Sequence, residues 1–160
     1  MNLVTLLLSS AVAFGLHILA GRWEGIALVV DPLLVVAVLG ALPGRPSLAL
    51  TVGLITGALQ DGWNSTWYGE HTFTHLVVAY LVSLLAQRMD LMGMLPAAAA
   101  VACATLADWG LQVGLRALFD RPLGAVPSML FWGLAVLANT GLALAFHRVL
   151  MAPRDPKRRR

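Results

Sequence analysis

Charged residues are scarce in this sequence. Only 12% of its 160 residues are Asp, Glu, Lys or Arg, whereas 59% are hydrophobic. A typical soluble domain has about 25% charged and about 45–50% apolar residues. The scarcity excludes an ordinary soluble domain and indicates an integral membrane protein, because the apolar runs approach the ~20 residues that cross a hydrocarbon core. The length allows one membrane domain and no sizeable soluble domain beside it.

Cysteine and catalytic motifs are also nearly absent. Cys103 is the single cysteine, so no disulfide can form within one chain. It lies in an Ala-rich apolar run, where we expect a small packing residue. The sequence contains no nucleophile elbow, no Gly-rich phosphate loop and no Ser/Lys pair. We therefore expect no enzymatic activity and no cofactor.

Six apolar runs predict an all-α protein with about six transmembrane helices. We expect them at residues 3–20, 26–42, 47–60, 71–87, 94–119 and 128–151. The first run lacks the basic segment and the cleavage site of a signal peptide, so we expect a retained helix. In the second run Asp31 can cap exposed N–H groups and Pro32 suits a first helical turn, which gives this helix an alternative start near Pro32.

Basic residues are concentrated at the end of the chain. Five of the eleven Lys and Arg residues lie in the last seven positions. Such a cluster just past a membrane helix is typical of a cytoplasmic anchor near anionic lipid, not of a nucleic-acid-binding face. We therefore predict a polytopic membrane domain over residues 1–152 and a basic cytoplasmic tail over 153–160. An even number of spans places both termini in the cytoplasm, with Trp23, Trp63, Trp67 and Tyr68 at the outer interface.

Small residues predict two closely packed surfaces. Gly53 and Gly57 form a Gly-x-x-x-Gly pair, which lets another helix approach closely. Thr56 and Gln60 share the face of this pair, so we expect the face to point at protein rather than at lipid. Residues 97–100 are four successive alanines. If the chain binds the single transmembrane helix of another protein, these two surfaces are the candidates.

Polar residues inside the predicted helices are the candidates for chemistry, because an unpaired charge within a bilayer costs several kcal/mol. Thr105, Asp108, Gln112 and Arg116 form one polar stripe along a helix face. Arg116, or a residue of another helix such as Asn139, is expected to compensate Asp108. We interpret Asp108 as a polar latch between helices, with a ligand or proton site as the alternative.

The connection after the third run carries further candidates. Asp61 is expected to end that helix and to bind backbone N–H groups of the connection, with contact to a partner protein as the alternative. His71 and His75 are four residues apart, as in zinc-ligating pairs. However, no third ligand is apparent and the order is not H-E-x-x-H, because Glu70 precedes both histidines. We therefore expect no metal site and interpret His75 as a buried hydrogen-bonding group.

Residues 57–80 contain a helix that ends in a carboxylate, a glycine before the next helix, and a set of motif positions: Gly57, Gln60, Asp61, Gly69, His71, His75, Leu76 and Tyr80. In these positions the chain resembles the rod shape-determining protein MreD family of bacterial inner membranes. The length, the six-span layout and the basic tail agree with the family over the whole chain. One departure is the order Asp31-Pro32, because family members often carry the proline before the polar residue.

The resemblance implies a non-catalytic inner-membrane subunit of the cell-elongation complex. Such a subunit binds the membrane-anchored protein MreC and helps to regulate peptidoglycan synthesis and cell shape. Its indirect partners are the RodA glycosyltransferase, the elongation transpeptidase and MreB filaments. On this interpretation helix packing or partner binding involves Gly53, Gly57, Asp61, Gly69 and Tyr80.

The family also resembles the substrate-binding S components of energy-coupling-factor transporters. This second resemblance implies an S-component-like bundle. It also implies an alternative function, a small-molecule-binding membrane subunit of a vitamin-type transporter. The polar positions Asp61, His75, Asp108, Gln112 and Asn139 would then line a pocket that opens to the outer face.

Overall fold

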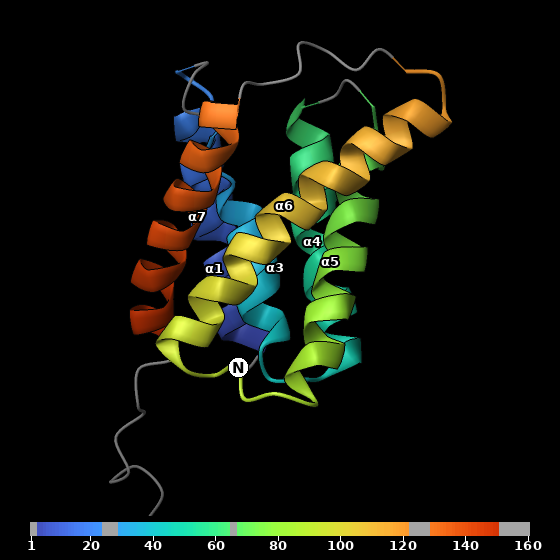
Figure 1. The fold of residues 1–160 in the computed structure, drawn as a ribbon. Helices are drawn as coiled ribbons and strands as arrows, with labels where there is room; N and C mark the ends of the chain where they lie inside the picture. The colour runs from blue at the N-terminus through green and yellow to red at the C-terminus, as the bar shows by residue number, and fades with distance from the viewer. Residues whose placement is uncertain (1–2, 24–28, 65–66, 122–128, 151–160) are drawn as a thin grey trace, which may run out of the picture.

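Six α-helices form the computed structural model, which describes residues 3–23, 29–64, 67–121 and 129–150. The helices are α1 (Leu3–Ala20), α3 (Pro32–Ala41), α4 (Pro46–Asn64), α5 (Glu70–Ala86), α6 (Met94–Leu118) and α7 (Met129–Leu150). No strand occurs in these ranges, so the prediction of an all-α fold is confirmed. Successive helices run in opposite directions, and the start of α1 and the end of α7 lie at the same end of the bundle (Figure 1). The predicted tail lies outside the described residues.

The short helix α3 is the centre of the bundle (Figure 1). All ten of its residues are buried, and it contacts each of the other five described helices. Its sequence is entirely apolar, so it has no polar face to turn outward. Ten residues rise about 15 Å, which is half of the ~30 Å hydrocarbon thickness of a bilayer. One end of α3 therefore lies inside the helix bundle.

The start of α3 corrects the prediction for the second apolar run. The described helix begins at Pro32, not at residue 26, which confirms the alternative start; residues 24–28 lie outside the described part of the chain. The carboxylate of Asp31 accepts a hydrogen bond from the backbone N–H of Leu34 at 2.9 Å, so it caps the helix as expected.

Helices α4 and α5 form a close antiparallel pair. A Cβ added at Gly53 would lie 2.7 Å from the backbone oxygen of His75, and one added at Gly57 would lie 2.4 Å from the Cα of Thr72. The prediction that this face points at protein is confirmed. The expectation that it receives a partner's helix is wrong, because α5 of the same chain already occupies it.

The other helix ends agree with the sequence to within one residue, with one exception. Helix α4 continues past Asp61 to Asn64, so the prediction that Asp61 ends this helix is wrong. The second expected docking surface is also partly used within the chain, because Ala97 and Ala98 are buried. Cys103, expected to be a packing residue, is exposed on α6 instead.

The outer surface of the bundle is rich in large apolar side chains. Leu8, Leu95 and Leu137 are each more than 60% exposed, and similar residues follow the outer faces of α1, α5, α6 and α7. Polar side chains such as Thr56, His75 and Asp108 are buried instead. By length and composition α6 and α7 are able to cross a membrane, whereas α1, α3 and α5 are shorter apolar helices. These features support membrane association.

Candidate functional site

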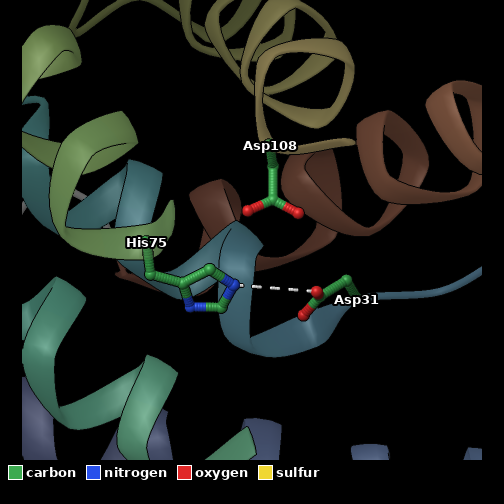
Figure 2. A group of neighbouring side chains, drawn as sticks. All are labelled: Asp31, His75 and Asp108. Atoms are coloured by element: carbon green, nitrogen blue, oxygen red, sulfur yellow. Dashed lines mark ion pairs between the residues drawn. The ribbon is translucent and has the colours of Figure 1, made fainter. Parts of the chain in front are cut away.

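Three ionisable side chains from different parts of the bundle meet in its interior. Asp31 precedes α3, His75 lies on α5 and Asp108 lies on α6, and the three side chains point toward one another (Figure 2). One nitrogen or oxygen atom from each residue lies within 4.8 Å of the others. His75 is fully buried, Asp108 is 1% exposed, and the side chain of Asp31 is 18% exposed. We call these residues the Asp–His–Asp cluster.

Asp31 connects the start of α3 with three other helices. Its Oδ2 atom accepts a hydrogen bond from Nε2 of Gln60 on α4 at 2.9 Å and lies 3.8 Å from Nε2 of His75. Its backbone N–H donates to Oδ1 of Asn139 on α7 at 2.8 Å. With the Leu34 cap on Oδ1, both carboxylate oxygens are held in fixed directions. Asp31 is therefore a rigid member of the cluster.

A hydrogen bond at Nδ1 orients the ring of His75. Its Nδ1 lies 3.2 Å from the hydroxyl oxygen of Thr56, and that hydroxyl donates to the carbonyl of Val52 at 2.9 Å. If the Thr56 hydroxyl donates to Val52, its oxygen accepts from the N–H at Nδ1, which is the tautomer of His75 that completes this chain of bonds. The other ring nitrogen, Nε2, faces the two carboxylates and has no hydrogen-bond partner. His75 is thus the buried hydrogen-bonding group that the sequence predicts.

Asp108 is held by its own helix. Its Oδ2 accepts from Nε2 of Gln112 at 2.6 Å, whereas its buried Oδ1 has no hydrogen-bond partner. The expected compensation by Arg116 is wrong. Arg116 binds Glu70 with two parallel bonds, Nε to Oε1 at 2.6 Å and a terminal nitrogen to Oε2 at 3.0 Å. Glu70 opens α5 near the end of α6, so it lies closer to the guanidinium than Asp108 does.

Asn139 is buried but does not supply the expected bond to Asp108. Its Nδ2 donates to Oγ1 of Thr105 at 3.4 Å, while its Oδ1 accepts from the backbone of Asp31. The polar stripe of α6 therefore faces several partners in turn: Thr105 meets α7, Asp108 meets the cluster and Arg116 meets α5. These contacts fit the interpretation of the stripe as a set of latches between helices.

Asp61 holds the connection between α4 and α5. Its carboxylate accepts from the backbone N–H groups of Gly69 at 3.0 Å, His71 at 2.9 Å and Thr72 at 2.9 Å, and from the Thr72 hydroxyl at 2.5 Å. This confirms the interpretation as a carboxylate that binds backbone N–H groups. Gly69 has φ of +96°, a conformation that favours glycine. Tyr80, in contrast, lies on the outside of α5 and is 40% exposed.

The predicted site residues are therefore only partly brought together. His75 and Asp108 meet, Gln112 touches Asp108, and Asp61 lies at a separate position in the connection. The sequence interpretation assigned Asp31 only to a cap and did not foresee the Glu70 partner of Arg116. The signal for Asp31 is its place twelve residues before Pro43 of the Pro43-Gly44 break, which makes the helix between them too short to cross the bundle. Comparisons with family models, curated proteins and solved structures found no match to this chain.

Proposed function

We propose that this chain is a non-catalytic inner-membrane subunit of the bacterial cell-elongation complex, with an MreC-like membrane-anchored protein as its direct partner. The proposal rests on the resemblance of residues 57–80 to the MreD family. The observation that carries the proposal is that the motif residues join α4 to α5. Gly57 allows the close approach of α5, Asp61 binds its first N–H groups, and Gly69 makes the turn. Such a motif is expected of a structural signature rather than of an active site.

The proposed topology has six membrane-spanning segments in an S-component-like bundle, with both termini in the cytoplasm. The antiparallel arrangement of the helices and the apolar outer surface support it. Helices α6 and α7 have the length and composition of spans. Helix α3 covers only about half of the expected thickness, so in the described chain the second segment is a half-helix.

The alternative function, vitamin-type ligand binding, requires a pocket of about 300–1,000 Å³. The shallow hollow between α6 and α7 encloses a volume of about 0 Å³ for a water-sized molecule, and it is lined by Thr105, Leu106, Trp109, Trp132 and Ala135. Of the five residues expected to line a ligand pocket, none lines this hollow. The described part of the chain therefore favours a scaffold over a carrier of small molecules.

Co-purification tests the proposed function directly. The chain is co-expressed with the MreC-like protein of the same genome, and an unrelated single-span membrane protein with the same tag is the control. We expect stable co-purification with the first protein alone, and rounded cells when the chain is depleted. Absence of both results would contradict the proposal, and ligand-dependent thermal stabilisation by a vitamin would favour the alternative.

A substitution scan for the contact surface requires positions that accept a large side chain without damage to the bundle. Gly57→Leu is unsuitable because the new side chain would collide with the backbone of α5. A Cβ at Gly110 or Gly114 of α6 meets nothing within 4 Å, and the same holds for Gly133 of α7. Leucine at each position, scored by co-purification, therefore separates an α6 contact from an α7 contact.

A further inference from the structure

We propose that Asp31, His75 and Asp108 bind one divalent transition-metal cation that ties α3, α5 and α6 together. The proposal does not depend on the elongation-complex function. Its starting point is the pair of buried atoms that have no hydrogen-bond partner, Nε2 of His75 and Oδ1 of Asp108. Both belong to the Asp–His–Asp cluster, in which the three side chains converge (Figure 2).

The proposed site uses the tautomer of His75 that carries its proton on Nδ1. In that tautomer Nδ1–H donates to Thr56, and the imidazole presents a lone pair at Nε2. That lone pair faces two carboxylates, which also present lone pairs. Groups of this kind repel one another unless a positive charge lies among them. The orientation of a histidine by a hydrogen bond at its other nitrogen is also typical of metal ligands.

Each carboxylate is held so that one oxygen stays directed at the cluster. On Asp31 the Leu34 N–H binds Oδ1, and Gln60 orients Oδ2 on the side of His75. On Asp108 the amide of Gln112 binds Oδ2 and leaves Oδ1 unpartnered. Neighbouring groups that orient metal ligands in this way raise the affinity of a site.

Charge and ligand type point to the class of cation. Two carboxylates carry two negative charges, so a divalent ion bound with neutral His75 makes the buried cluster neutral. One imidazole nitrogen and two carboxylate oxygens suit Zn²⁺ and its neighbours better than Mg²⁺ or Ca²⁺, which prefer oxygen alone.

The distances are compatible with a small adjustment on binding. Zinc bonds of about 2.0–2.1 Å in tetrahedral geometry place the ligand atoms about 3.3 Å apart. Nε2 of His75 and Oδ2 of Asp31 are already 3.8 Å apart, and all three ligand atoms lie within 4.8 Å. Side-chain rotations that move the ligand atoms by about 1 Å therefore bring them to the spacing of a zinc site.

The sequence indicated no metal site because the third ligand is remote. The zinc-like spacing suggested His71 and His75 as the pair, but the cluster uses His75 with two aspartates from other parts of the chain. His71 has its own buried and unpartnered Nδ1 but is not a member of the cluster. It is therefore a useful control in a binding test.

The test uses the full chain purified in detergent with a histidine-free affinity tag. The protein is treated with a chelator, desalted, and equilibrated with Zn²⁺ or with Mg²⁺. We expect about one zinc per chain by elemental analysis and a rise in Tm of several degrees with Zn²⁺, but no rise with Mg²⁺. A wild-type protein that retains no zinc would overturn the proposal and would leave a shared proton as the cation of the cluster.

Variants distinguish this site from surface binding. We expect Asp108→Asn and His75→Gln to lose the zinc and the Tm rise, whereas His71→Gln and the exposed Asp90→Asn keep both. Size-exclusion chromatography checks that each variant is folded. Asp108→Asn preserves the shape of the side chain and its bond to Gln112, so it serves if His75→Gln does not fold. Equal zinc binding by Asp108→Asn and by the wild type would mean an adventitious surface ion and would refute the site.

Discussion

At the scale of single residues, two aspartates do similar work in different places. Asp31 caps the helix that follows it directly, and Asp61 binds the first N–H groups of a helix that starts nine residues later at Glu70. The first role is visible in the sequence because Asp-Pro at a helix start is a local pattern. The second role depends on how the connection folds back, although the sequence did indicate that Asp61 binds backbone N–H groups there.

Removal of the Asp61 carboxylate is expected to destabilise the protein. In Asp61→Ala three backbone N–H groups at the start of α5 lose their charged acceptor. Hydrogen bonds to charged groups contribute about 1.5–3 kcal/mol each, and loss of a cap costs about 0.5–2 kcal/mol. We therefore expect a loss of about 2–4 kcal/mol in the free energy of unfolding, measured by reversible denaturation in detergent.

The control for this prediction is Asp90→Ala. Asp90 accepts one exposed hydrogen bond, from the backbone N–H of Met92 at 3.1 Å. Its removal is expected to change the free energy of unfolding by less than about 0.5 kcal/mol. A similar loss for the two variants would show that Asp61 has no special part in the connection.

The Asp–His–Asp cluster could not be predicted from local patterns. His75 and Asp108 are each recognisable as polar residues inside apolar helices, and both are buried as expected. Their neighbours are set by how α3, α5 and α6 pack, and one sequence contains no direct record of that packing. The same holds for Arg116, whose nearest carboxylate along its own helix is Asp108 but whose partner is Glu70.

At the scale of elements, the α4–α5 pair shows what a small-residue motif does and does not predict. Gly53 and Gly57 correctly predict a close helix contact. They do not say whether the neighbour belongs to the same chain or to another. Because α5 follows α4 through a short connection held by Asp61, the neighbour in the same chain reaches this face first.

Gly57→Ala is expected to disrupt this pair. The added methyl group would lie 2.4 Å from the Cα of Thr72 and 2.5 Å from the carbonyl oxygen of His71, and neither backbone atom can move without displacement of α5. Overpacking of this kind typically costs about 1–3 kcal/mol, and we expect a value at the upper end. The measurement is the free energy of unfolding or Tm in detergent.

Gly110→Ala is the matched control on α6. Its methyl group meets nothing within 4 Å, and alanine favours a helix over glycine by about 0.5–1 kcal/mol. We expect an unchanged or slightly higher Tm. If both variants lowered the Tm equally, contact with α5 would not explain the effect of Gly57→Ala.

At the scale of the whole molecule, most of the helix pattern was visible in the sequence. The ends of four helices are predicted to within one residue because polar residues, proline and glycine interrupt the apolar runs there. Two helices differ: α4 continues past Asp61 to Asn64, and α3 starts late because Asp31-Pro32 interrupts an apolar run that hydropathy alone makes continuous. The arrangement of the helices around α3 depends on tertiary contacts, and it was not predictable from the apolar runs of the sequence.

Cysteine labelling tests the proposed six-span topology. In a Cys103→Ala background, Tyr68→Cys places a thiol between α4 and α5, and Arg88→Cys places one after α5. Tyr68 is 70% exposed, and Arg88 is exposed as well. We expect a membrane-impermeant maleimide to label Tyr68→Cys in intact cells, but Arg88→Cys only after permeabilisation. Labelling of both positions in intact cells would contradict the topology.

The central position of α3 also bears on the order of events during synthesis. Of the described helices α3 is the second to be synthesised, yet four of the five that enclose it are synthesised later. Until α7 is complete, the backbone N–H of Asp31 lacks its acceptor, Oδ1 of Asn139. A nascent chain stopped before residue 129 thus exposes an incompletely enclosed half-helix to lipid or to the insertion machinery. Helix α7 completes the contacts that hold α3 in place. Truncation from the C-terminal side is therefore expected to affect the core of the bundle and not only its edge.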